Sequence, residues 1–124
     1  MTGDRRRGTM KTRREMIKEY KNTIRPMGIV QVKNLRNNRV YLAASVDTAG
    51  TINSIRFQLK MGNFLPSAEL ANDWKEMGEE NFLIGVLDEL KPVEDPAYDY
   101  RDDLEALAAM WREKLKPFGE RGYH

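Results

Sequence analysis

Two short segments rich in β-branched residues, separated by a polar turn, constrain this 124-residue chain more than any other feature. Residues 28–34 (GIVQVKN) and 39–45 (RVYLAAS) have the composition and alternation of strands, and Asn37–Asn38 lies between them. Asparagine tolerates the left-handed backbone that a tight turn needs, so the pattern predicts a β-hairpin. The period of two places Val30 and Val32 on one face of the first strand.

Apolar spacing outside the hairpin completes the predicted order of elements. Helices are predicted over residues 11–22, 51–61, 67–77 and 100–115, and a third, buried strand over 81–90. This order predicts an α+β domain in which helices flank a small three-stranded antiparallel sheet. We expect a single domain over residues 11–124, preceded by a disordered basic tail over residues 1–10.

The residue types that are missing exclude several kinds of site. There is no cysteine, and the only histidine is His124, which excludes disulfide frameworks, thiol chemistry, histidine-dependent triads and multi-histidine metal sites. No apolar run approaches the ~18 residues of a transmembrane helix. The basic N-terminus also lacks the apolar stretch of a secretory signal. We therefore expect a cytoplasmic protein with no membrane partner.

Charge is distributed unevenly, although the formal net charge is only +2. Residues 1–65 carry 14 Lys/Arg and 4 Asp/Glu, whereas residues 66–124 carry 7 Lys/Arg and 15 Asp/Glu. Such asymmetry indicates an interaction surface, and nucleic acid is one candidate partner for the basic half. Attraction between the two halves of the folded chain is the alternative interpretation.

The hairpin also carries a resemblance to a known superfamily. GIV at Gly28–Val30 and YLA at Tyr41–Ala43 resemble the paired signature of the GIY-YIG nucleases. The helix after the hairpin, the segment Asn72–Phe82 (NDWKEMGEENF), the VLDEL strand and the MWREKL helix follow in the order of small bacterial members. The resemblance spans residues 26–124, which is most of the chain.

This resemblance implies metal-assisted hydrolysis of a phosphodiester in DNA. Tyrosines of the two strands would help to activate water, and an arginine on the following helix would stabilise phosphate charge. A glutamate on the last long helix would hold a divalent cation. Phosphoryl transfer needs a metal to neutralise developing charge, and a carboxylate suits Mg²⁺ because that ion prefers hard oxygen ligands.

The two strands depart from the family pattern at two of three motif positions. The first motif tyrosine falls on Val30, which has no hydroxyl, and the final motif glycine falls on Ala43. The second motif tyrosine is present as Tyr41. A lone phenol is a poor base near neutral pH, and tyrosine is also a favoured strand residue, so packing is the preferred interpretation of Tyr41.

The helices and the C-terminus depart further. The arginine position falls between Thr51 and Ser54, a segment without arginine, and the metal glutamate falls on Ala108. Some members end in GYN with a functional asparagine, but here His124 follows Gly122–Tyr123. We interpret Trp74 and Trp111 as core residues on apolar helical stripes. The acidic pairs Asp88–Glu89 and Glu94–Asp95 lack a ligand spacing and are interpreted as solvated.

These departures predict a catalytically degenerate domain that binds nucleic acid or a protein partner and needs no cofactor. The predicted nucleic-acid-binding residues are the cations of the hairpin and the next helix: Lys33, Arg36, Arg39, Arg56 and Lys60.

Two alternatives stay open. One is an active Mg²⁺- or Mn²⁺-dependent DNA endonuclease with a relocated site, in which Tyr41 and Arg56 act with Glu105 as the metal ligand. Glu105 lies one helical turn before Ala108, on a similar helix face. The other alternative is a structural or regulatory interaction module that does not bind nucleic acid.

Overall fold

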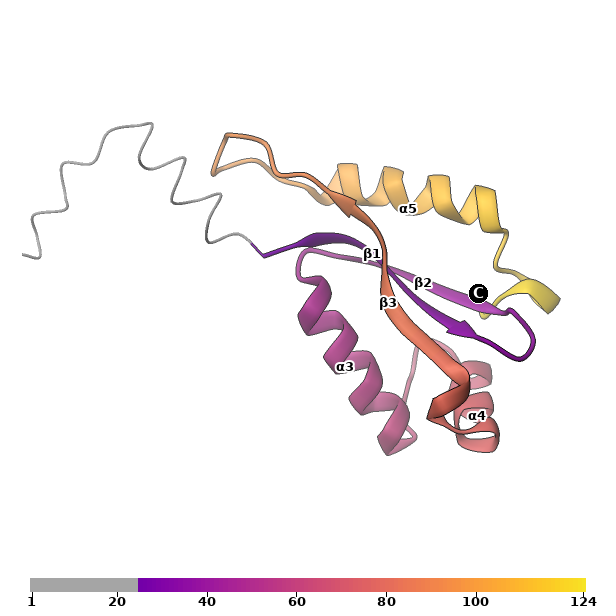
Figure 1. Ribbon diagram of the computed structural model, residues 1–124. Coiled ribbons are helices and arrows are strands. Elements are labelled where there is room, and N and C mark those ends of the chain that lie inside the picture. Colours follow the sequence, from indigo (N-terminus) through magenta and orange to yellow (C-terminus); the bar gives the residue numbers. More distant parts are fainter. Residues whose placement is uncertain (1–24) are drawn as a thin grey trace, which may run out of the picture. The chain divides into compact units, whose positions relative to one another are not determined.

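The computed structural model describes residues 25–124, so the tail predicted over 1–10 and the helix predicted over 11–22 lie outside the described residues. The elements are β1 (Met27–Asn34), β2 (Val40–Ser45), α3 (Thr48–Met61), α4 (Ala68–Met77), β3 (Phe82–Leu90) and α5 (Arg101–Leu115). Short 3-10 turns cover Glu79–Asn81 and Gly119–Arg121. The predicted α+β class is confirmed, because a three-stranded antiparallel sheet is flanked by these helices (Figure 1).

The sheet is built around β1. The strand order is β2-β1-β3, and β1 pairs with both neighbours in antiparallel register. In the predicted hairpin, Val30 lies opposite Ala43 and Val32 lies opposite Tyr41. Asn38 has a φ of 64°, the left-handed conformation that the turn requires.

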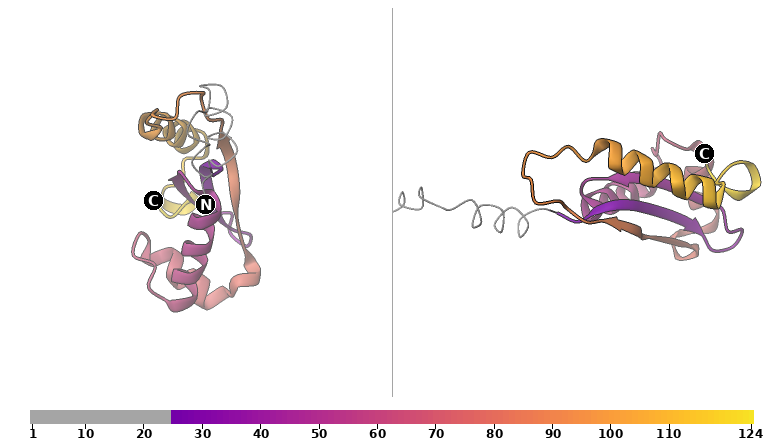
Figure 2. Two further views of the ribbon diagram at one scale, coloured as in Figure 1. Left: turned by 90° about the vertical axis from the view of Figure 1, so that its left-hand side faces the viewer. Right: turned by 90° about the horizontal axis from the view of Figure 1, so that it is seen from above.

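The helices cover opposite faces of the sheet, and each face has its own apolar cluster (Figures 1 and 2). Val30 and Val32 of β1 point toward α3 and α4, where they pack with Ile55, Leu59 and Leu70. Val40, Leu42 and Ile29 point toward α5, where they pack with Ala108. The strand alternation predicted for the hairpin therefore supplies both cores.

β3 corrects one expectation. The sequence predicted a buried strand over residues 81–90, but β3 is an edge strand and only Phe82 is buried along it. Its apolar run resembles a central strand because both of its faces carry apolar residues under helices. Leu83 and Val86 nevertheless remain 48% and 42% exposed. Between Ile29 and Val30 of β1 the register shifts by one residue, which makes Leu87 the extra residue of a β-bulge.

Local signals set the helix limits. Asp47 caps α3 by accepting a hydrogen bond from Gly50 N–H at 3.1 Å, so the helix begins three residues earlier than predicted. Gly62 ends α3 in a left-handed conformation (φ 77°). Ser67 caps α4 by accepting from Leu70 N–H at 3.2 Å. The predicted helices over 67–77 and 100–115 agree with α4 and α5 to within one residue.

Residues Arg25–Lys91 and Tyr100–His124 form one compact unit, and the site described below lies within it. The segment Pro92–Asp99 groups outside that unit and contains a turn in which Tyr98 N–H donates to the Asp95 carbonyl. Among the described residues, no helix has the length and apolar character needed to cross a bilayer.

Candidate functional site

The centre of the hairpin is filled by apolar side chains. Val30 is fully buried, and its Cβ points into the cluster beneath α3 and α4. Ala43, directly opposite on β2, adds only a methyl group. Neither position offers a group that could activate water or contact a phosphate.

Tyr41 lies next to Ala43 on the same face of β2, in a half-buried aromatic stack. Its ring meets Phe64 edge-on with centroids 5.2 Å apart and stacks on the His124 imidazole at 4.8 Å, with the planes 9° apart. Burial raises the pKa of the Tyr41 phenol above its ordinary value. A general base near neutral pH needs the opposite shift, so this environment suits packing rather than proton abstraction.

His124 closes the other side of that stack. Its Nε2 accepts a hydrogen bond from the backbone N–H of Leu42 at 2.9 Å, which requires an unprotonated Nε2. Burial and the nearby charge of Arg112 lower the pKa of His124, consistent with the neutral imidazole. The histidine therefore acts as an acceptor for the outer edge of β2.

The first turns of α3 are tied to β2 through small hydroxyl groups. The Thr51 and Ser45 hydroxyls lie 2.6 Å apart, and Ser45 Oγ also accepts from Asp47 N–H at 2.9 Å. Arg56 lies five residues after Thr51, which turns it by about 140° around the helix. Arg56 therefore projects away from the Thr51 side and toward the opposite side of α3.

On the other sheet face, Ala108 of α5 is 4% exposed and packs against Val40 and Leu42 of β2. Glu105, one turn earlier, is exposed. Trp111 is partly buried in the same cluster, and its indole N–H donates to Asp88 at 2.9 Å. The interpretation of Trp111 as a core residue thus holds in part, and the interpretation of Asp88 as merely solvated is wrong.

A polar network fastens the C-terminal residues to the hairpin and α4. The Arg39 Nε and Nη2 atoms donate to the Gly122 carbonyl at 3.2 and 2.9 Å, and the guanidinium lies 4.4 Å from the Tyr123 ring centroid. Arg39 Nη2 also lies 2.9 Å from Glu69, and Nη1 lies 3.7 Å from Asp73. Only 17% of the Arg39 side chain is exposed.

The Tyr123 hydroxyl joins this network from inside. It donates to Asp73 at 2.7 Å and accepts from the Asn34 amide at 3.1 Å, and Asn34 is fully buried. Burial and the hydrogen bond to Asp73 raise the pKa of Tyr123 to about 12. Apart from the Gly-Tyr pair near the C-terminus, no sequence pattern indicates this network, because its members are far apart in the chain.

Comparison with known proteins identifies the fold to which this geometry belongs. No protein-family model and no curated protein matches the chain. Two solved structures do match. One is the catalytic domain of the homing endonuclease I-TevI, which is 25% identical, with a TM-score of 0.64 over 78% of this chain and 95% of that chain. The other, a mutant of the same intron-endonuclease domain, is 25% identical with a TM-score of 0.64 over 80% and 92%.

The chain has a GIY-YIG-like fold. The resemblance stated from the motif residues is therefore confirmed at the level of fold. The predicted positions of the GIY-YIG motif and of its helical partners lie on two sides of the sheet, because Val30 and Tyr41 pack toward α3 and α4, whereas Ala108 packs on the α5 side. Thr51 contacts Ser45 of β2, Ala108 packs on Val40 and Leu42, and His124 binds the backbone of Leu42. These positions hold small, apolar or hydrogen-bonded side chains and do not meet at one point.

The residues at this GIY-YIG-like site do not fit a divalent cation. Ala108 presents a methyl group, and no group of three or more histidine or acidic side chains suitable for a metal occurs among residues 25–124. The relocated-site alternative is not assembled either. Tyr41 faces α3 and α4, Glu105 is on α5 over the opposite sheet face, and Arg56 is turned away from the Thr51 side of its helix.

The five cations predicted to bind nucleic acid lie in different places. Lys33 lies on the α5 face of β1, and Arg36 is exposed in the hairpin turn. Arg39 belongs to the C-terminal network. Arg56 and Lys60 lie on α3, where Lys60 Nζ is 3.8 Å from Glu79. The structure therefore does not bring the predicted set together on one surface.

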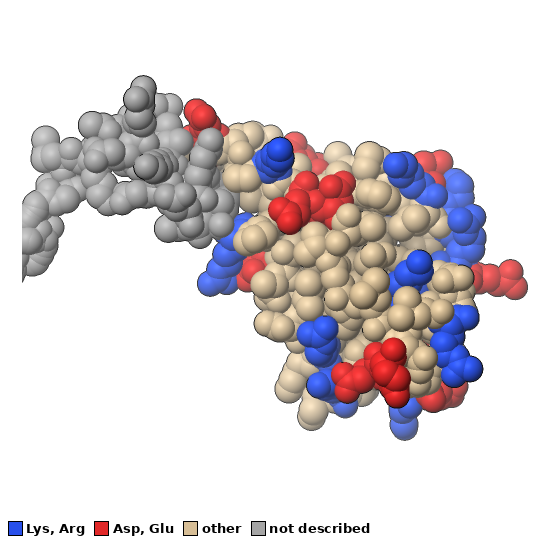
Figure 3. All heavy atoms as spheres, in the orientation of Figure 1, with Lys and Arg blue, Asp and Glu red and all other residues tan. Residues whose placement is uncertain are grey.

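A different basic group forms where the hairpin turn meets the C-terminal segment. A recess of 220 Å³ is lined by Lys33, Asn37 and Asn38 from the hairpin and by Leu115, Glu120 and Arg121. Arg36 adjoins Asn37, and Lys116 adjoins Leu115. We call Lys33, Arg36, Lys116 and Arg121 the basic end. Figure 3 shows lysine and arginine gathered along this side of the molecule. Lys116 and Arg121 were not among the predicted binding residues, because only the fold places them beside the hairpin.

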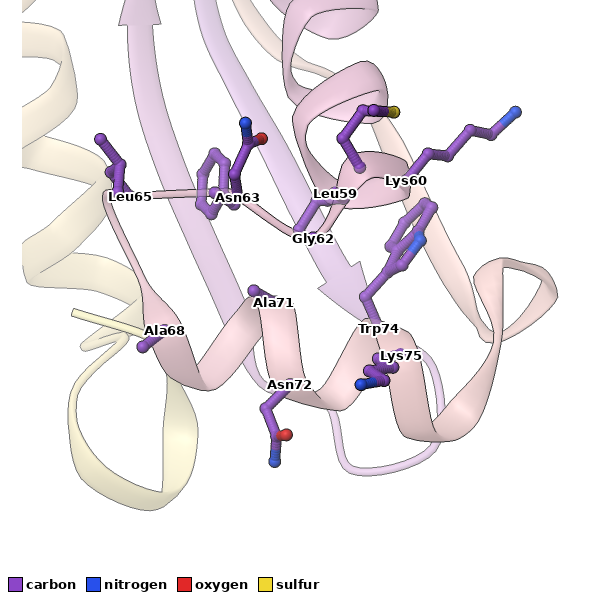
Figure 4. A pocket seen from close by; sticks show the side chains of 12 residues that line it. Leu59, Lys60, Gly62, Asn63, Leu65, Ala68, Ala71, Asn72, Trp74 and Lys75 are labelled. Carbon is purple, nitrogen blue, oxygen red and sulfur yellow. The ribbon is translucent and has the colours of Figure 1, made fainter.

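A groove of 730 Å³ with a mixed polar and apolar lining lies between the end of α3 and α4 (Figure 4). Trp74 extends from α4 toward the last turn of α3, whereas Asn72 points away. Met61 and Leu65 line the groove and are 63% and 91% exposed. Its lining includes lysines but no histidine, aspartate or glutamate, so the groove offers surface for binding and no acid–base pair.

Proposed function

We propose that this chain is a GIY-YIG-fold domain that no longer hydrolyses phosphodiesters and binds the nucleic-acid backbone through its basic end. One observation carries the loss of hydrolysis. The positions that would hold the reacting groups carry none: Val30 of β1 and Ala108 of α5 are packed in the two apolar clusters, Thr51 of α3 is hydrogen-bonded to Ser45, and Ala43 of β2 offers only a methyl group. Restoring a metal ligand would require space that the α5 cluster now fills.

The basic end supports the binding part of the proposal. Residues 25–124 carry 13 Lys/Arg and 16 Asp/Glu, so the described part has a net negative charge. Attraction for a nucleic acid must therefore come from lysines and arginines that are grouped on one part of the surface. Lys33 and Arg121 line one recess from elements far apart in the chain. Such a group suits phosphate oxygens, which position a nucleic acid without reading its sequence.

The first experiment tests hydrolysis and binding on the same samples. Supercoiled plasmid is incubated with Mg²⁺ or Mn²⁺, and mobility shifts are run at two salt concentrations. We expect no nicking and a shift that weakens steeply with salt, because phosphate contacts release counterions. Metal-dependent nicking that Glu105→Gln abolishes would restore the nuclease alternative.

Variants then locate the surface. Lys33→Gln combined with Arg36→Gln and Arg121→Gln should weaken binding by about tenfold or more and reduce the salt slope by about 0.9 per lost contact on duplex DNA. Lys75→Gln, on α4, is the matched control. A separate variant neutralises Arg5–Arg7 of the predicted tail. Binding that depends on that tail and not on the basic end would contradict the proposal.

The α3–α4 groove favours a second candidate, a protein partner. Its lining combines exposed apolar side chains with Lys60 and Lys75, which fits a partner segment that carries both apolar and acidic residues. Leu65→Ser should weaken such a complex without affecting the mobility shift. Binding that survives high salt would separate this candidate from the phosphate-driven one.

A further inference from the structure

The two edges of the sheet differ in what lies on their outer side. At β2, Val40 forms a parallel bridge with Gly122, and Leu42 N–H donates to the His124 imidazole. No other segment of the compact unit pairs with the outer side of β3 (Figure 2). Within that unit, the C-terminal segment covers the β2 edge at Val40 and Leu42, whereas the outer side of β3 is left for extending the sheet.

The first half of β3, Phe82–Val86, lacks the features that usually protect an edge strand, whereas the second half carries the Leu87 bulge and the charged Asp88 and Glu89. Charged side chains, prolines and bulges on an edge strand usually prevent it from pairing with another chain. Residues 82–87 contain no charged residue and no proline, and the bulge at Leu87 leaves Phe82–Val86 as a regular segment. Leu83 and Val86 are exposed on it, and Figure 3 shows a surface with few charged residues at the centre of this view.

We propose that a second copy of this chain pairs its own Phe82–Val86 antiparallel to this segment, joining the two sheets into one of six strands. About a two-fold axis at Ile84, Phe82 faces Val86, and Leu83 faces Gly85 of the other copy. A Cβ at Gly85 would meet no atom within 4 Å, so there is room opposite Leu83. The pairing is self-complementary, as an isologous interface must be.

The closed β2 edge favours a second copy over an open assembly. Pairing through β3 uses the one open edge of each unit, so the assembly ends at two copies rather than growing into a fibre. This inference is independent of the nucleic-acid proposal, because the basic end lies at the hairpin turn and the C-terminal segment.

Charges beyond the paired segment give the dimer a salt dependence of its own. In this register Glu79 and Glu80 of one copy approach Asp88 and Glu89 of the other. Within one copy, Glu79 lies 3.8 Å from Lys60 Nζ and Asp88 accepts a hydrogen bond from the Trp111 indole, and these contacts neutralise only part of the negative charge. Screening of these like charges should tighten the dimer as salt rises, opposite to the expected effect of salt on phosphate binding.

The test is sedimentation equilibrium of the full chain over a wide concentration range at two salt concentrations. Gly85→Lys and Leu83→Lys place a like charge at the two-fold contact and should raise the dimer Kd by about tenfold or more. Gly85→Lys enters open space and should leave the monomer folded, which circular dichroism verifies. Val46→Lys is the control, because Val46 is 63% exposed and lies away from β3.

Concentration-dependent dimers weakened by both β3 variants and not by the control would support the proposal. A monomer at every concentration would overturn it. So would a dimer that neither β3 variant weakens, or one that Val46→Lys weakens equally.

Discussion

Arg39 was predicted to bind nucleic acid, but its contacts indicate that it stabilises the fold, and substitutions at this position can distinguish the two roles. Its guanidinium donates twice to the Gly122 carbonyl and lies over the Tyr123 ring. Charge-assisted hydrogen bonds contribute about 1.5–3 kcal/mol, and a cation–π contact adds about 0.5–1 kcal/mol. The pair with Glu69, which is 70% exposed, adds little. Arg39→Ala should therefore lower the free energy of unfolding by about 3 kcal/mol.

Arg39→Lys refines this prediction. Lysine keeps the charge but lacks the planar fork that reaches the carbonyl and covers the ring, so we expect a loss of about 1–2 kcal/mol. Urea unfolding of the full chain, followed by tryptophan fluorescence, measures both variants. The melting temperature should fall by roughly 10 °C or more for Arg39→Ala, since about 1 kcal/mol corresponds to ~4–8 °C in a domain of this size.

Arg36→Ala is the matched control for Arg39. It removes an exposed arginine three residues away, and we expect a change in stability below about 0.5 kcal/mol. Arg36→Ala should instead weaken nucleic-acid binding. If Arg39→Ala unfolds at the same urea concentration as Arg36→Ala, the network around Gly122 and Tyr123 does not hold the fold as argued.

Three further predictions follow from the same region. A Cβ at Gly122 would overlap the Pro117 backbone, so Gly122→Ala should cost about 2–3 kcal/mol in urea unfolding, whereas Gly85→Ala should cost almost nothing. The pKa of His124 is lower in the folded chain than the ordinary histidine value of about 6.5. Its contact with the Leu42 N–H therefore contributes its full stability above about pH 6.5, and this contribution is lost as the pH falls from there through the lower folded-state pKa. NMR of the Leu42 amide between pH 7.5 and 5 should report this change, and an unchanged amide would contradict it. The raised pKa of Tyr123 means that the unfolded chain loses its phenolic proton first, so stability should fall between pH 10 and about 12; Tyr123→Phe should reduce that fall and leave only the part that comes from Tyr41, whose pKa is also raised.

The sequence predicted the elements well wherever the decisive physics is local. The Asn37–Asn38 turn, the alternation around Val30 and the stop at Gly62 act within a few residues, and the hairpin and helices follow them closely. β3 was placed correctly but its burial was not. An apolar run indicates that both faces are covered, but it does not show whether both edges have partners.

The candidate site could be predicted only in part. Motif spacing pointed to Tyr41, Ala43 and Ala108; the fold places the first two on β2 and the third on α5, where it packs on the opposite face of the sheet from Tyr41. Motif spacing gave no indication that Arg39 is held by the carbonyl of Gly122, 83 residues away. It also could not show that Lys33 and Arg121 share a recess. Such contacts depend on how the chain returns to the hairpin, which no short pattern encodes.

The burial of Ala108 has a consequence for the engineering of this fold. A glutamate at this position would place an ionised carboxylate among Ile29, Val40 and Leu42, at a site only 4% exposed. An unpaired buried charge there would lower the stability of the fold. A single Ala108→Glu substitution should therefore destabilise the chain, and a carboxylate could be accommodated at this position only after the packing of α5 against β2 had been rearranged.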